Sequence, residues 1–532
     1  PDEPEEPETS QDLTAQLEFV GNPTLERWLT RGTANSILDI EVNDDRLFFA
    51  CGEWSGNSGP VFMKSFDPYF CTYTNEYAAG TEGVEVLRTF SDGGLYFPAI
   101  DHMDKGSYDN GYWFKRTKGG EWSAGFANGT SKKLYTHVYD MQQFGDWMFL
   151  YSGCPVGSKD GGANWLRLDG LDSNKQNGSL LRCGDEFFCV EAYPIDFGTG
   201  TNPTATPISD PYTRHGPTVW RWNAATEMFA STVEPTWDNL APEIVLSDCD
   251  LVTTDASQVG RPGRFWHTTP FKNRCLYVIG DEYSDRTYTV NGKSVTLKPI
   301  GTRPEIAVSA YAENGALKGT RIHLPAKTWP IDFTVVGDTA YMLAFSYVSD
   351  TQMVRHGVWK STDGVSFTEI LTVDYPQVMQ AFDYHMGYFY FGVAHQNAEP
   401  NLGPIKSGTK ESAGDVYRVY CPQEPVAAVA SVPTLSIAEG GSAAVSYVLS
   451  ARPETNVTLS VRLLGDSGLA LSAAQLVFTP SDWDVPHGLK VTYPTNDACD
   501  PGAVTLVCGV GTPASPRGRF DSREVTASLV KV

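Results

Sequence analysis

The sequence lacks long hydrophobic runs, CxxC pairs and an excess of positive charge. No run of about 18 apolar residues occurs, which is the length that a membrane-spanning helix needs, and no basic-then-apolar leader is present. Lys and Arg total 40 against 64 Asp and Glu, so the formal net charge is −24. Such a charge repels phosphate backbones and anionic lipid headgroups. We therefore expect no transmembrane segment and no nucleic-acid partner, and we expect any export signal to have been removed already.

The ten cysteines also lack metal-site spacing, because none lies at a zinc-finger or haem-attachment distance from a histidine. Disulfides in an oxidising compartment fit this distribution better, which predicts a secreted or cell-surface protein. Cys499 and Cys508 form the best predicted pair, since strand-like residues flank the Pro-Gly turn between them. The alternative is a cytosolic protein with buried free thiols.

The chain is long enough to bury more than one hydrophobic core, since it has 532 residues of which 41% are hydrophobic. Its first eight residues, "PDEPEEPE", are only acids and prolines and cannot bury enough surface to fold alone. We expect an acidic, proline-rich tail or linker over 1–17 and two folded units, over 18–421 and 426–532.

Seven hairpin-like stretches repeat along the larger unit. Each reads as a strand, a tight turn with Gly, Asp or Asn, and a second strand rich in aromatic and β-branched residues. A weaker hairpin follows most copies, and two hairpins make one four-stranded sheet. The pattern predicts an all-β fold, a seven-bladed β-propeller over 18–421, in which residues 24–30 complete the last blade. The seven stretches are 39–52, 87–102, 138–153, 179–192, 265–282, 331–347 and 381–395.

Two short segments carry a family resemblance. "SKDGGANW" (158–165) and the shorter "STDGVSF" (361–367) resemble the Asp-box, or BNR repeat, of the sialidase-like β-propellers. The resemblance implies a turn between the third and fourth strands of a blade, in which the Asp accepts backbone N–H bonds and the aromatic residue packs between sheets. It identifies a fold and no chemistry. The matching residues are Ser158, Asp160, Gly162, Trp165, Ser361, Asp363 and Phe367.

Residues 426–532 contain few aromatics and alternate Val, Leu, Ser and Thr between turn signals, which predicts a small β-sandwich. "AEGGSAAVSYVLS" and "FTPSDWDVPHGLKVT" resemble the Calx-β-like and immunoglobulin-like modules of bacterial surface proteins. We expect a spacer or docking module. The alternative of a calcium site would use Asp482, Asp484, Asp497 and Asp500.

Long polar connections lie on one predicted face of the propeller, where binding sites are commonly built. Polar residues near the start of the inner strands should meet there around the axis, among them Asp39, Asp281 and Asp383. Histidine beside carboxylate suits proton transfer near neutral pH, arginine suits acidic groups, and exposed aromatics stack on sugars. The predicted catalytic candidates are His137, Asp140, His102, Arg88 and Asp332. The predicted ligand-binding candidates are Glu53, Trp54, Asp101, Tyr108, Arg182, Arg214, His215, Trp266, His267, Tyr384 and His395.

We expect no metal or other cofactor at this site. The alternative is zinc held by His102, His137 and His267, since imidazoles that converge on an axis can bind it. In a structural interpretation, all these polar residues only bond one another and water along the channel.

These patterns favour a secreted or cell-surface protein whose partner is a glycan. The residue types leave open whether it is an enzyme. A sialidase is disfavoured, because no Phe/Tyr-Arg-Ile-Pro stretch opens the chain, and a lyase-like set of His137, Tyr139, His102 and Arg88 rests on residue type alone. The alternative function is a non-catalytic structural or assembly component of an extracellular layer or filament, with a protein partner or self-assembly.

Overall fold

The computed structural model divides into two compact units, which we describe separately. The first comprises Pro1–Phe66, Tyr73–His385 and Phe389–Val419, and the second comprises Asp67–Thr72, Met386–Tyr388 and Tyr420–Val532. The structure describes residues 15–25, 36–44, 46–52, 59–68, 71–102, 111–127, 138–152, 154–168, 178–191, 218–232, 237–240, 242, 265–279, 286–290, 293–297, 306–348, 353–385, 387–393, 413–421, 426–432, 434–449, 456–464, 469–479, 481–495, 503–511, 520–521 and 524–530.

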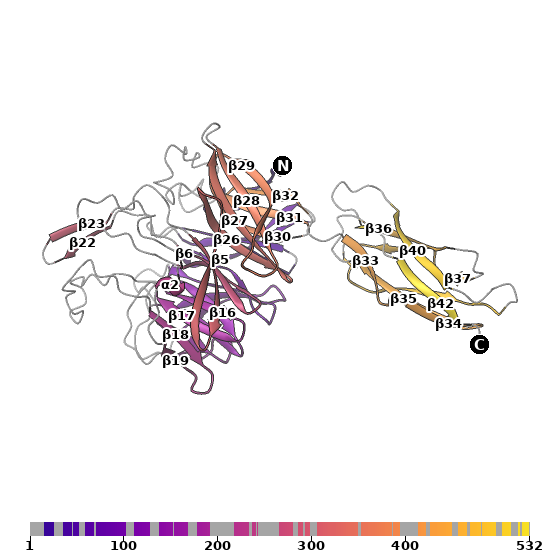
Figure 1. The fold of residues 1–532 in the computed structure, drawn as a ribbon, viewed down its shortest axis with the longest axis horizontal. Helices are drawn as coiled ribbons and strands as arrows, with labels where there is room; N and C mark the ends of the chain where they lie inside the picture. Colours follow the sequence, from indigo (N-terminus) through magenta and orange to yellow (C-terminus); the bar gives the residue numbers. More distant parts are fainter. Residues whose placement is uncertain are drawn as a thin grey trace, which may run out of the picture. The chain divides into compact units, whose positions relative to one another are not determined.

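Four-stranded antiparallel sheets make up most of the first unit (Figure 1), and we number them 1 to 7 by the chain order of the edge strands β2, β7, β12, β16, β20, β26 and β30. Aromatic and β-branched residues fill these strands and alternate between the two faces of each sheet. Sheet 1 holds β2 (Ile37–Asn43), β3 (Arg46–Cys51), β4 (Val61–Asp67) and β5 (Thr72–Ala79), and sheet 2 holds β7 (Arg88–Thr89), β8 (Leu95–Pro98), β10 (Tyr112–Arg116) and β11 (Trp122–Phe126). Sheet 3 holds β12 (Asp140–Phe144), β13 (Trp147–Tyr151), β14 (Pro155–Ser158) and β15 (Leu166–Arg167), and sheet 4 holds β16 (Gly178–Cys183), β17 (Glu186–Glu191), β18 (Thr218–Asn223) and β19 (Met228–Ser231).

The remaining sheets follow the same order, with one exception in the last. Sheet 5 holds β20 (Phe265–Phe271), β21 (Arg274–Ile279), β24 (Ile306–Glu313) and β25 (Ala316–Ile322). Sheet 6 holds β26 (Thr328–Val336), β27 (Thr339–Val348), β28 (Met353–Ser361) and β29 (Thr368–Tyr375). Sheet 7 holds β30 (Met379–His385), β31 (Tyr388–Val393), β32 (Val416–Tyr420) and, as its outer strand, β1 (Glu18–Gly21) from the other end of the unit.

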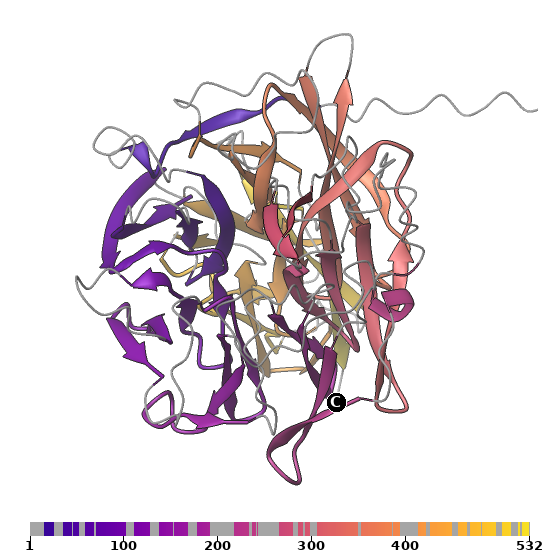
Figure 2. The same ribbon diagram turned by 90° about the vertical axis from the view of Figure 1, so that its left-hand side faces the viewer.

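The sheets form a closed ring. Neighbouring sheets contact one another in turn, through β2 with β7, β8 with β12, β12 with β16, β16 with β20, β20 with β26 and β26 with β30, and β30 contacts β2 again. In Figure 2 the sheets follow one another around this unit in the order of the colour bar. Such a ring of four-stranded sheets is the arrangement of a β-propeller.

Sheet 7 closes the ring with a strand other than the predicted one. The outer strand is β1, residues 18–21, whereas we expected residues 24–30. Glu18 pairs with Arg418 in the β1–β32 register, and its carboxylate accepts bonds from Arg418 Nη2 at 2.8 Å and Nε at 3.1 Å. Because a bidentate pair of this kind is both strong and geometrically specific, it fixes the closure at Glu18.

Hydrophobic side chains fill the spaces between neighbouring sheets. Leu276 of sheet 5 packs with Phe333 and Met342 of sheet 6, and Phe188 of sheet 4 packs with Tyr277 of sheet 5. Each fully buried side chain of this size contributes about 1.5–3 kcal/mol. The ring is therefore held by packing between sheets, while the polar ends of its inner strands remain available for a site.

Two hairpins lie where the sequence analysis expected a long polar loop or no element. β22 (Arg286–Val290) and β23 (Lys293–Leu297) form a separate two-stranded sheet within the predicted loop of sheet 5. β24 and β25 meet at an Asn314–Gly315 turn, with φ of +53° and +79° at the two residues. Asn-Gly is the usual sequence of such a tight turn, because both central residues need positive φ. The further elements of this unit are the β6 (Thr81–Gly83) and β9 (Ile100–His102) pair and the helix α2 (Trp237–Leu240).

Two five-stranded sheets form the second unit. Side chains from both sheets, among them Ile437, Tyr447, Leu459 and Phe478, share one buried hydrophobic cluster. The first sheet orders β37 (Ala470–Leu471), β39 (His487–Thr492), β35 (Ser442–Leu449), β33 (Val426–Ala430) and β41 (Phe520–Asp521). The second orders β34 (Thr434–Ala438), β42 (Glu524–Val530), β40 (Ala503–Gly511), β36 (Val457–Leu464) and β38 (Gln475–Phe478).

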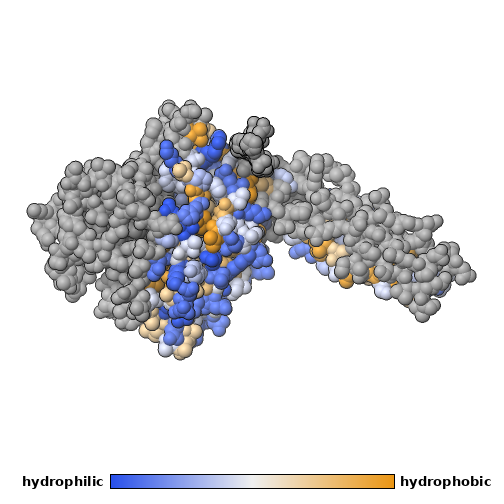
Figure 3. Space-filling view, in the orientation of Figure 1, coloured by the Kyte–Doolittle hydropathy of each residue, from blue (hydrophilic) through white to orange (hydrophobic). Residues whose placement is uncertain are grey.

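The visible surface mixes hydrophilic residues with small hydrophobic areas (Figure 3). The most exposed large hydrophobic side chains, such as Phe19, Phe62 and Leu166, come from different sheets. Single residues of this kind are normal on a folded surface. A search of the described residues found no helix with the length and apolar character needed to cross a bilayer.

Candidate functional site

The candidate site begins with three irregular positions on inner strands. The strand pairing shifts register between Ile37 and Asp39 in β2, between Trp266 and Thr269 in β20, and between Pro330 and Asp332 in β26. A bulge bends its strand and re-aims a side chain that regular pleating would point elsewhere.

His267 lies inside the second bulge and has a φ of +49°. Left-handed backbone at a residue other than glycine costs free energy, and it persists only where the surrounding structure holds it. The two residues that follow the other bulges, Asp39 and Asp332, approach His267 from β2 and β26.

His267 and Asp332 form a buried ion pair. His267 Nδ1 lies 2.8 Å from Asp332 Oδ1, and the two side chains are 10% and 3% exposed. Asp332 Oδ1 also accepts the Phe333 N–H at 2.7 Å, and Oδ2 accepts the Phe382 N–H at 3.1 Å. The carboxylate is thus fixed by the backbone of two sheets and in turn fixes the imidazole.

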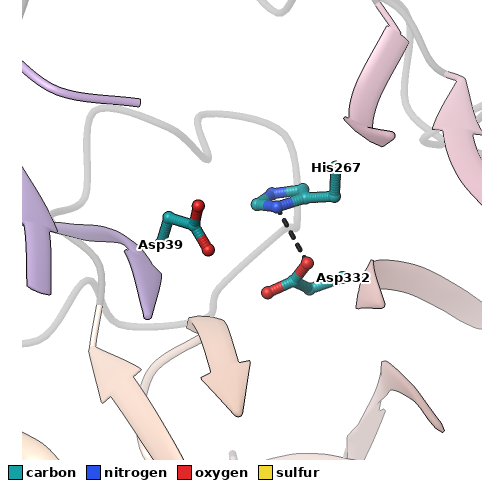
Figure 4. A group of neighbouring side chains, drawn as sticks. All are labelled: Asp39, His267 and Asp332. Carbon is teal, nitrogen blue, oxygen red and sulfur yellow. Dashed lines mark ion pairs between the residues drawn. The ribbon is translucent and has the colours of Figure 1, made fainter. Parts of the chain in front are cut away.

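Asp39 completes a triad with this pair. One carboxylate oxygen of Asp39, one imidazole nitrogen of His267 and one oxygen of Asp332 all lie within 4.8 Å of one another. Asp39 Oδ2 accepts the Leu87 N–H at 2.7 Å, which holds the side chain in place. Figure 4 shows the three side chains pointing toward one another from different strands. We call Asp39, His267 and Asp332 the axial triad.

A second polar group joins sheets 2, 3 and 5. Arg88 Nη2 donates to Thr268 Oγ1 at 2.9 Å and lies 3.4 Å from Asp140 Oδ1. Asp140 Oδ2 accepts the Leu180 N–H at 2.9 Å. Arg88 is therefore held by its neighbours, and its charge compensates part of the negative charge at the axis.

A third group lies between sheets 7, 1 and 6. Asp383 Oδ2 accepts the Val42 N–H at 3.0 Å, and its Oδ1 accepts bonds from the Thr334 hydroxyl and the Tyr384 N–H. Glu41 Oε1 accepts the Thr89 N–H at 3.0 Å. Together with Asp39, Asp140 and Asp332, these residues place five carboxyl groups around Arg88 and His267.

The crowded carboxyl groups hold their protons more tightly than usual. Burial, with a further contribution from the Asp332 charge, raises the pKa of Asp39 to about 7. Burial and the Asp383 charge raise the pKa of Glu41 to about 8, and burial also raises the pKa of Asp383 to about 7. Desolvation favours the neutral acid, and a nearby like charge adds to this effect. These three carboxyl groups are therefore partly protonated near neutral pH.

The Arg88 charge lowers the pKa of Asp140, whereas the Asp332 charge raises the pKa of His267. Burial raises the pKa of Asp140, although the Arg88 charge works against this shift. Burial disfavours the imidazolium of His267, but the charge and hydrogen bond of Asp332, together with the Asp39 charge, raise the pKa of His267. The imidazole is thus biased toward its protonated form beside a carboxylate.

Four of these carboxylates also brace the ring. Each accepts a backbone N–H from the following sheet or from the residue directly before that sheet, so each joins two neighbours in the ring. The four carboxylate–donor pairs are Asp39 with Leu87, Asp140 with Leu180, Asp332 with Phe382, and Asp383 with Val42.

The structure brings together four of the predicted site residues, namely Arg88, Asp140, His267 and Asp332. Arg182 does not join them: it is exposed and donates to the Gly184 carbonyl at the hairpin turn. Tyr384 packs against Tyr341 at 5.9 Å between ring centroids, within the protein. Asp101, His102 and Trp266 lie on described backbone, but their side chains are outside the description. Outside the described residues lie Glu53, Trp54, Tyr108, His137, Arg214, His215, Asp281 and His395.

Thr268 belongs to the second polar group, and Glu41 and Thr334 belong to the third. None of the three was among the predicted site residues. Glu41 lies two residues after Asp39 on the same strand, and alternate residues share one face. That period of two was the signal for Glu41. The sequence contains no such signal for Thr268. It follows His267 directly, and adjacent residues of a regular strand point to opposite faces, but the bulge lets Thr268 contact Arg88 and Asp140.

The two Asp-box-like segments form tight turns away from the axis. Ser158 Oγ accepts the Gly162 N–H at 2.9 Å, and Asp160 Oδ1 accepts the Asn164 N–H at 2.8 Å, between β14 and β15. Gly162 has a φ of +92°, and a Cβ there would lie 2.2 Å from the Trp113 ring, so only glycine fits. The buried Trp165 packs against Trp113 at 6.1 Å between ring centroids.

The second segment repeats these contacts between β28 and β29. Ser361 Oγ accepts the Gly364 N–H at 2.9 Å, and Asp363 Oδ1 accepts the Val365 and Ser366 N–H groups at 2.8 Å. Phe367 packs against Phe333 at 6.0 Å between ring centroids. The contacts of both turns are internal, so these segments stabilise their sheets.

The predicted disulfide and calcium residues are only partly described. Cys499 lies outside the described residues, and Cys508 lies in β40, where the backbone alone is described, so their pairing stays a prediction. Asp482 Oδ1 accepts the Thr479 hydroxyl at 2.7 Å, and its Oδ2 lies 3.3 Å from His487 Nε2. Asp484 is exposed, and Asp497 and Asp500 lie outside the described residues.

No family model matches the chain. No curated protein matches it either. Among solved structures it is similar to the WD40 β-propeller domain of Doa1, with a TM-score of 0.36 and 11% identity over 77% of this chain and 96% of that chain. It is also similar to a Synechocystis apocarotenoid oxygenase mutant, with a TM-score of 0.33 and 11% identity over 64% of this chain and 71% of that one. A prolyl endopeptidase structure gives a TM-score of 0.33 and 9% identity over 92% of this chain and 55% of that one. These scores are low, and the contacts between strands define the fold.

Proposed function

We propose that the protein is a secreted or cell-surface protein that interacts with carbohydrate through one face of its propeller and acts on it as a hydrolase or lyase. The observation that carries this proposal is the axial triad, in which Asp39, His267 and Asp332 come within 4.8 Å of one another from sheets 1, 5 and 6. Such a group of carboxylates and imidazole suits general acid–base catalysis.

The two reactions would use the triad differently. In hydrolysis, the Asp39 carboxyl, whose pKa of about 7 leaves it partly protonated at neutral pH, would donate a proton to the glycosidic oxygen as that C–O bond breaks, and water would add its hydroxyl to the anomeric carbon. In a lyase reaction, the neutral form of His267, which the Asp332 charge makes the less populated one, would remove the proton beside a uronate carboxylate, and the C–H electrons would form a C=C bond as the neighbouring glycosidic C–O bond breaks. Asp332 is a positioning residue in either case, because both of its oxygens are occupied by His267 and backbone donors.

The proposal is tested on a panel of neutral and acidic polysaccharides. The assays measure new reducing ends for hydrolysis and ultraviolet absorbance of unsaturated uronates for elimination, and a glycan array measures binding. Asp39→Asn and His267→Gln are expected to lower kcat by about 100-fold or more, which is the usual contribution of a general acid or base.

Asp338→Asn is the matched control, because Asp338 is exposed at the turn between β26 and β27 and is predicted to keep full activity. Absence of binding and turnover on every glycan would overturn the proposal. Equal activity of Asp39→Asn and the control would mean that the triad does not take part in the reaction.

A second candidate function is a non-catalytic structural or assembly component. It is favoured by the bracing bonds and by the low exposure of Asp140, Asp332 and Asp383, which are 4%, 2% and 6% exposed. It predicts that Asp39→Asn changes stability alone, and that light scattering finds self-association in the full chain that disappears without residues 1–17. A monomer in both samples would contradict it.

The finer features of the fold complete the proposal. We infer a seven-bladed propeller over 18–421 with two Asp-box turns, a Calx-β-like or immunoglobulin-like sandwich over 426–532, and an acidic linker over 1–17. The propeller is supported by the seven sheets that follow one another around the ring and by the turns at Asp160 and Asp363. The sandwich is supported by the core that the two five-stranded sheets share. An extracellular location also accords with a disulfide between Cys499 and Cys508.

A further inference from the structure

We propose that the axial triad of Asp39, His267 and Asp332 binds one divalent metal ion of the Zn²⁺ or Mn²⁺ type. From the sequence we expected no metal, and the zinc alternative combined His267 with two other histidines, His102 and His137. The described structure instead surrounds His267 with two carboxylates.

The spacing of the triad is close to that of a metal site. One ligand atom from each residue lies within 4.8 Å of the other two, and the Nδ1–Oδ1 distance from His267 to Asp332 is 2.8 Å. In a tetrahedral zinc site, bonds of about 2.0–2.1 Å place the ligand atoms about 3.3 Å apart. A metal ion would therefore replace the His267–Asp332 contact: Nδ1 would give up its proton, the Nδ1–Oδ1 distance would open by about 0.5 Å, and the Asp39 carboxylate would move toward the pair.

The supporting contacts are those that metal ligands need. Backbone N–H groups of Leu87 and Phe382 fix the carboxylates of Asp39 and Asp332 from the neighbouring sheets. Hydrogen bonds of this kind orient ligands and tune their affinity. Since the three ligands come from three sheets of one ring, the site does not depend on a single flexible loop.

The charge at the axis also favours a cation. Asp39, Glu41, Asp140, Asp332 and Asp383 contribute five carboxyl groups, whereas His267 and Arg88 are the positive partners that contact them. Arg88 is already shared between Asp140 and Thr268. Among the described residues, a divalent ion in the triad would add positive charge next to these carboxyl groups.

The ligand types select the ion. Imidazole with carboxylate suits Zn²⁺ and Mn²⁺, while Ca²⁺ takes about 6–8 oxygen ligands and has no use for nitrogen. Three protein ligands leave at least one coordination position for water or a substrate oxygen, as in catalytic rather than structural zinc sites. The inference stands on this geometry and does not require the proposed action on glycans.

Metal binding is measured on the full chain after treatment with EDTA and dialysis. Isothermal titration with zinc chloride or manganese chloride, followed by elemental analysis of the dialysed protein, is expected to give one ion per chain. Asp39→Asn and His267→Gln are each expected to weaken binding by at least about tenfold, the range found for disturbed metal sites. Cobalt substitution should give visible absorption bands that His267→Gln abolishes.

Asp140→Asn is the matched control, because Asp140 braces the next sheet as Asp39 does but lies outside the triad. It removes one of the five carboxyl groups but none of the three ligands, so it should keep one ion per chain and lose much less affinity than Asp39→Asn does. Circular dichroism checks that every variant is folded. No stoichiometric ion at tenfold excess of either metal, or equal weakening in Asp140→Asn and Asp39→Asn, would overturn the proposal.

Discussion

Asp332→Ala is expected to lower the free energy of unfolding by about 3–5 kcal/mol, because it removes one partner of a buried ion pair and the acceptor of two buried N–H groups. Asp332 is 2% exposed, and its oxygens accept bonds from the backbone of Phe333 and Phe382 and contact His267. Water cannot replace these partners at so buried a position. Urea unfolding at pH 7 measures the change.

The hairpin of Asp332 supplies its own control. Asp338 lies at the turn between β26 and β27 and is exposed, so Asp338→Ala should change the unfolding free energy by less than about 0.5 kcal/mol. If Asp332→Ala is as mild as the control, Asp332 is not the buried brace described above.

Acidification from pH 6.5 toward pH 3 is expected to remove about 3–5 kcal/mol of stability through His356 alone. His356 in β28 is fully buried, and its Nε2 accepts the Met379 N–H at 2.9 Å. Burial lowers the pKa of His356 to about 3, although the nearby Asp374 charge, which is paired with Arg355, opposes the shift.

The sign follows from the proton balance of the two states. Below an ordinary histidine pKa near 6.5, the unfolded chain binds a proton that the folded protein excludes until the pH approaches 3. The stability that neutral His356 provides is therefore complete above about pH 6.5 and is lost as the pH falls.

His356→Gln isolates this effect, because glutamine can accept the Met379 N–H but does not titrate. Urea unfolding at pH 7, 5.5 and 4 should show a fall in stability that is about 3 kcal/mol smaller in the variant than in the wild type. His323→Gln, at an exposed histidine, should follow the wild-type profile. Parallel profiles for wild type and His356→Gln would contradict the prediction.

Much of the fold could be predicted from the sequence because hairpins are local. The strand–turn–strand pattern marks each inner hairpin within about 15 residues, and turn residues with positive φ, such as Gly145, Gly184 and Gly337, lie where the pattern places them. Ring closure was harder. β1 is only four residues long and is recruited by pairing with a strand some 400 residues away, which no local pattern specifies.

The hairpin of β24 and β25 shows a different difficulty. Its Asn314–Gly315 turn is a strong local signal, yet it follows β21 only after a long intervening segment that contains the β22–β23 hairpin. Assigning the two strands to sheet 5 needs the pairing of β21 with β24, which is a tertiary contact. Local patterns thus predicted the strands better than their membership in a sheet.

The candidate site was predictable in composition more than in geometry. Regular alternation predicts that Asp39, Asp140, His267 and Asp332 lie on inner strands. The sequence does not show the bulges that orient three of these side chains toward one point. Arg182 illustrates the converse error, because its position along β16 takes it to the turn and away from the axis. Register decides between the two outcomes, and register is set by the neighbouring strand.

The axial triad requires that His267 of sheet 5 and Asp332 of sheet 6, which lie 65 positions apart in the chain, meet at one point, and a double-mutant cycle tests this most directly. His267→Gln, Asp332→Asn and the double variant are unfolded in urea at pH 6, where the imidazole carries charge. Contact at 2.8 Å predicts a coupling free energy of about 1–3 kcal/mol between the two positions. Single-variant effects that add to within about 0.3–0.5 kcal/mol would mean that the two side chains do not meet.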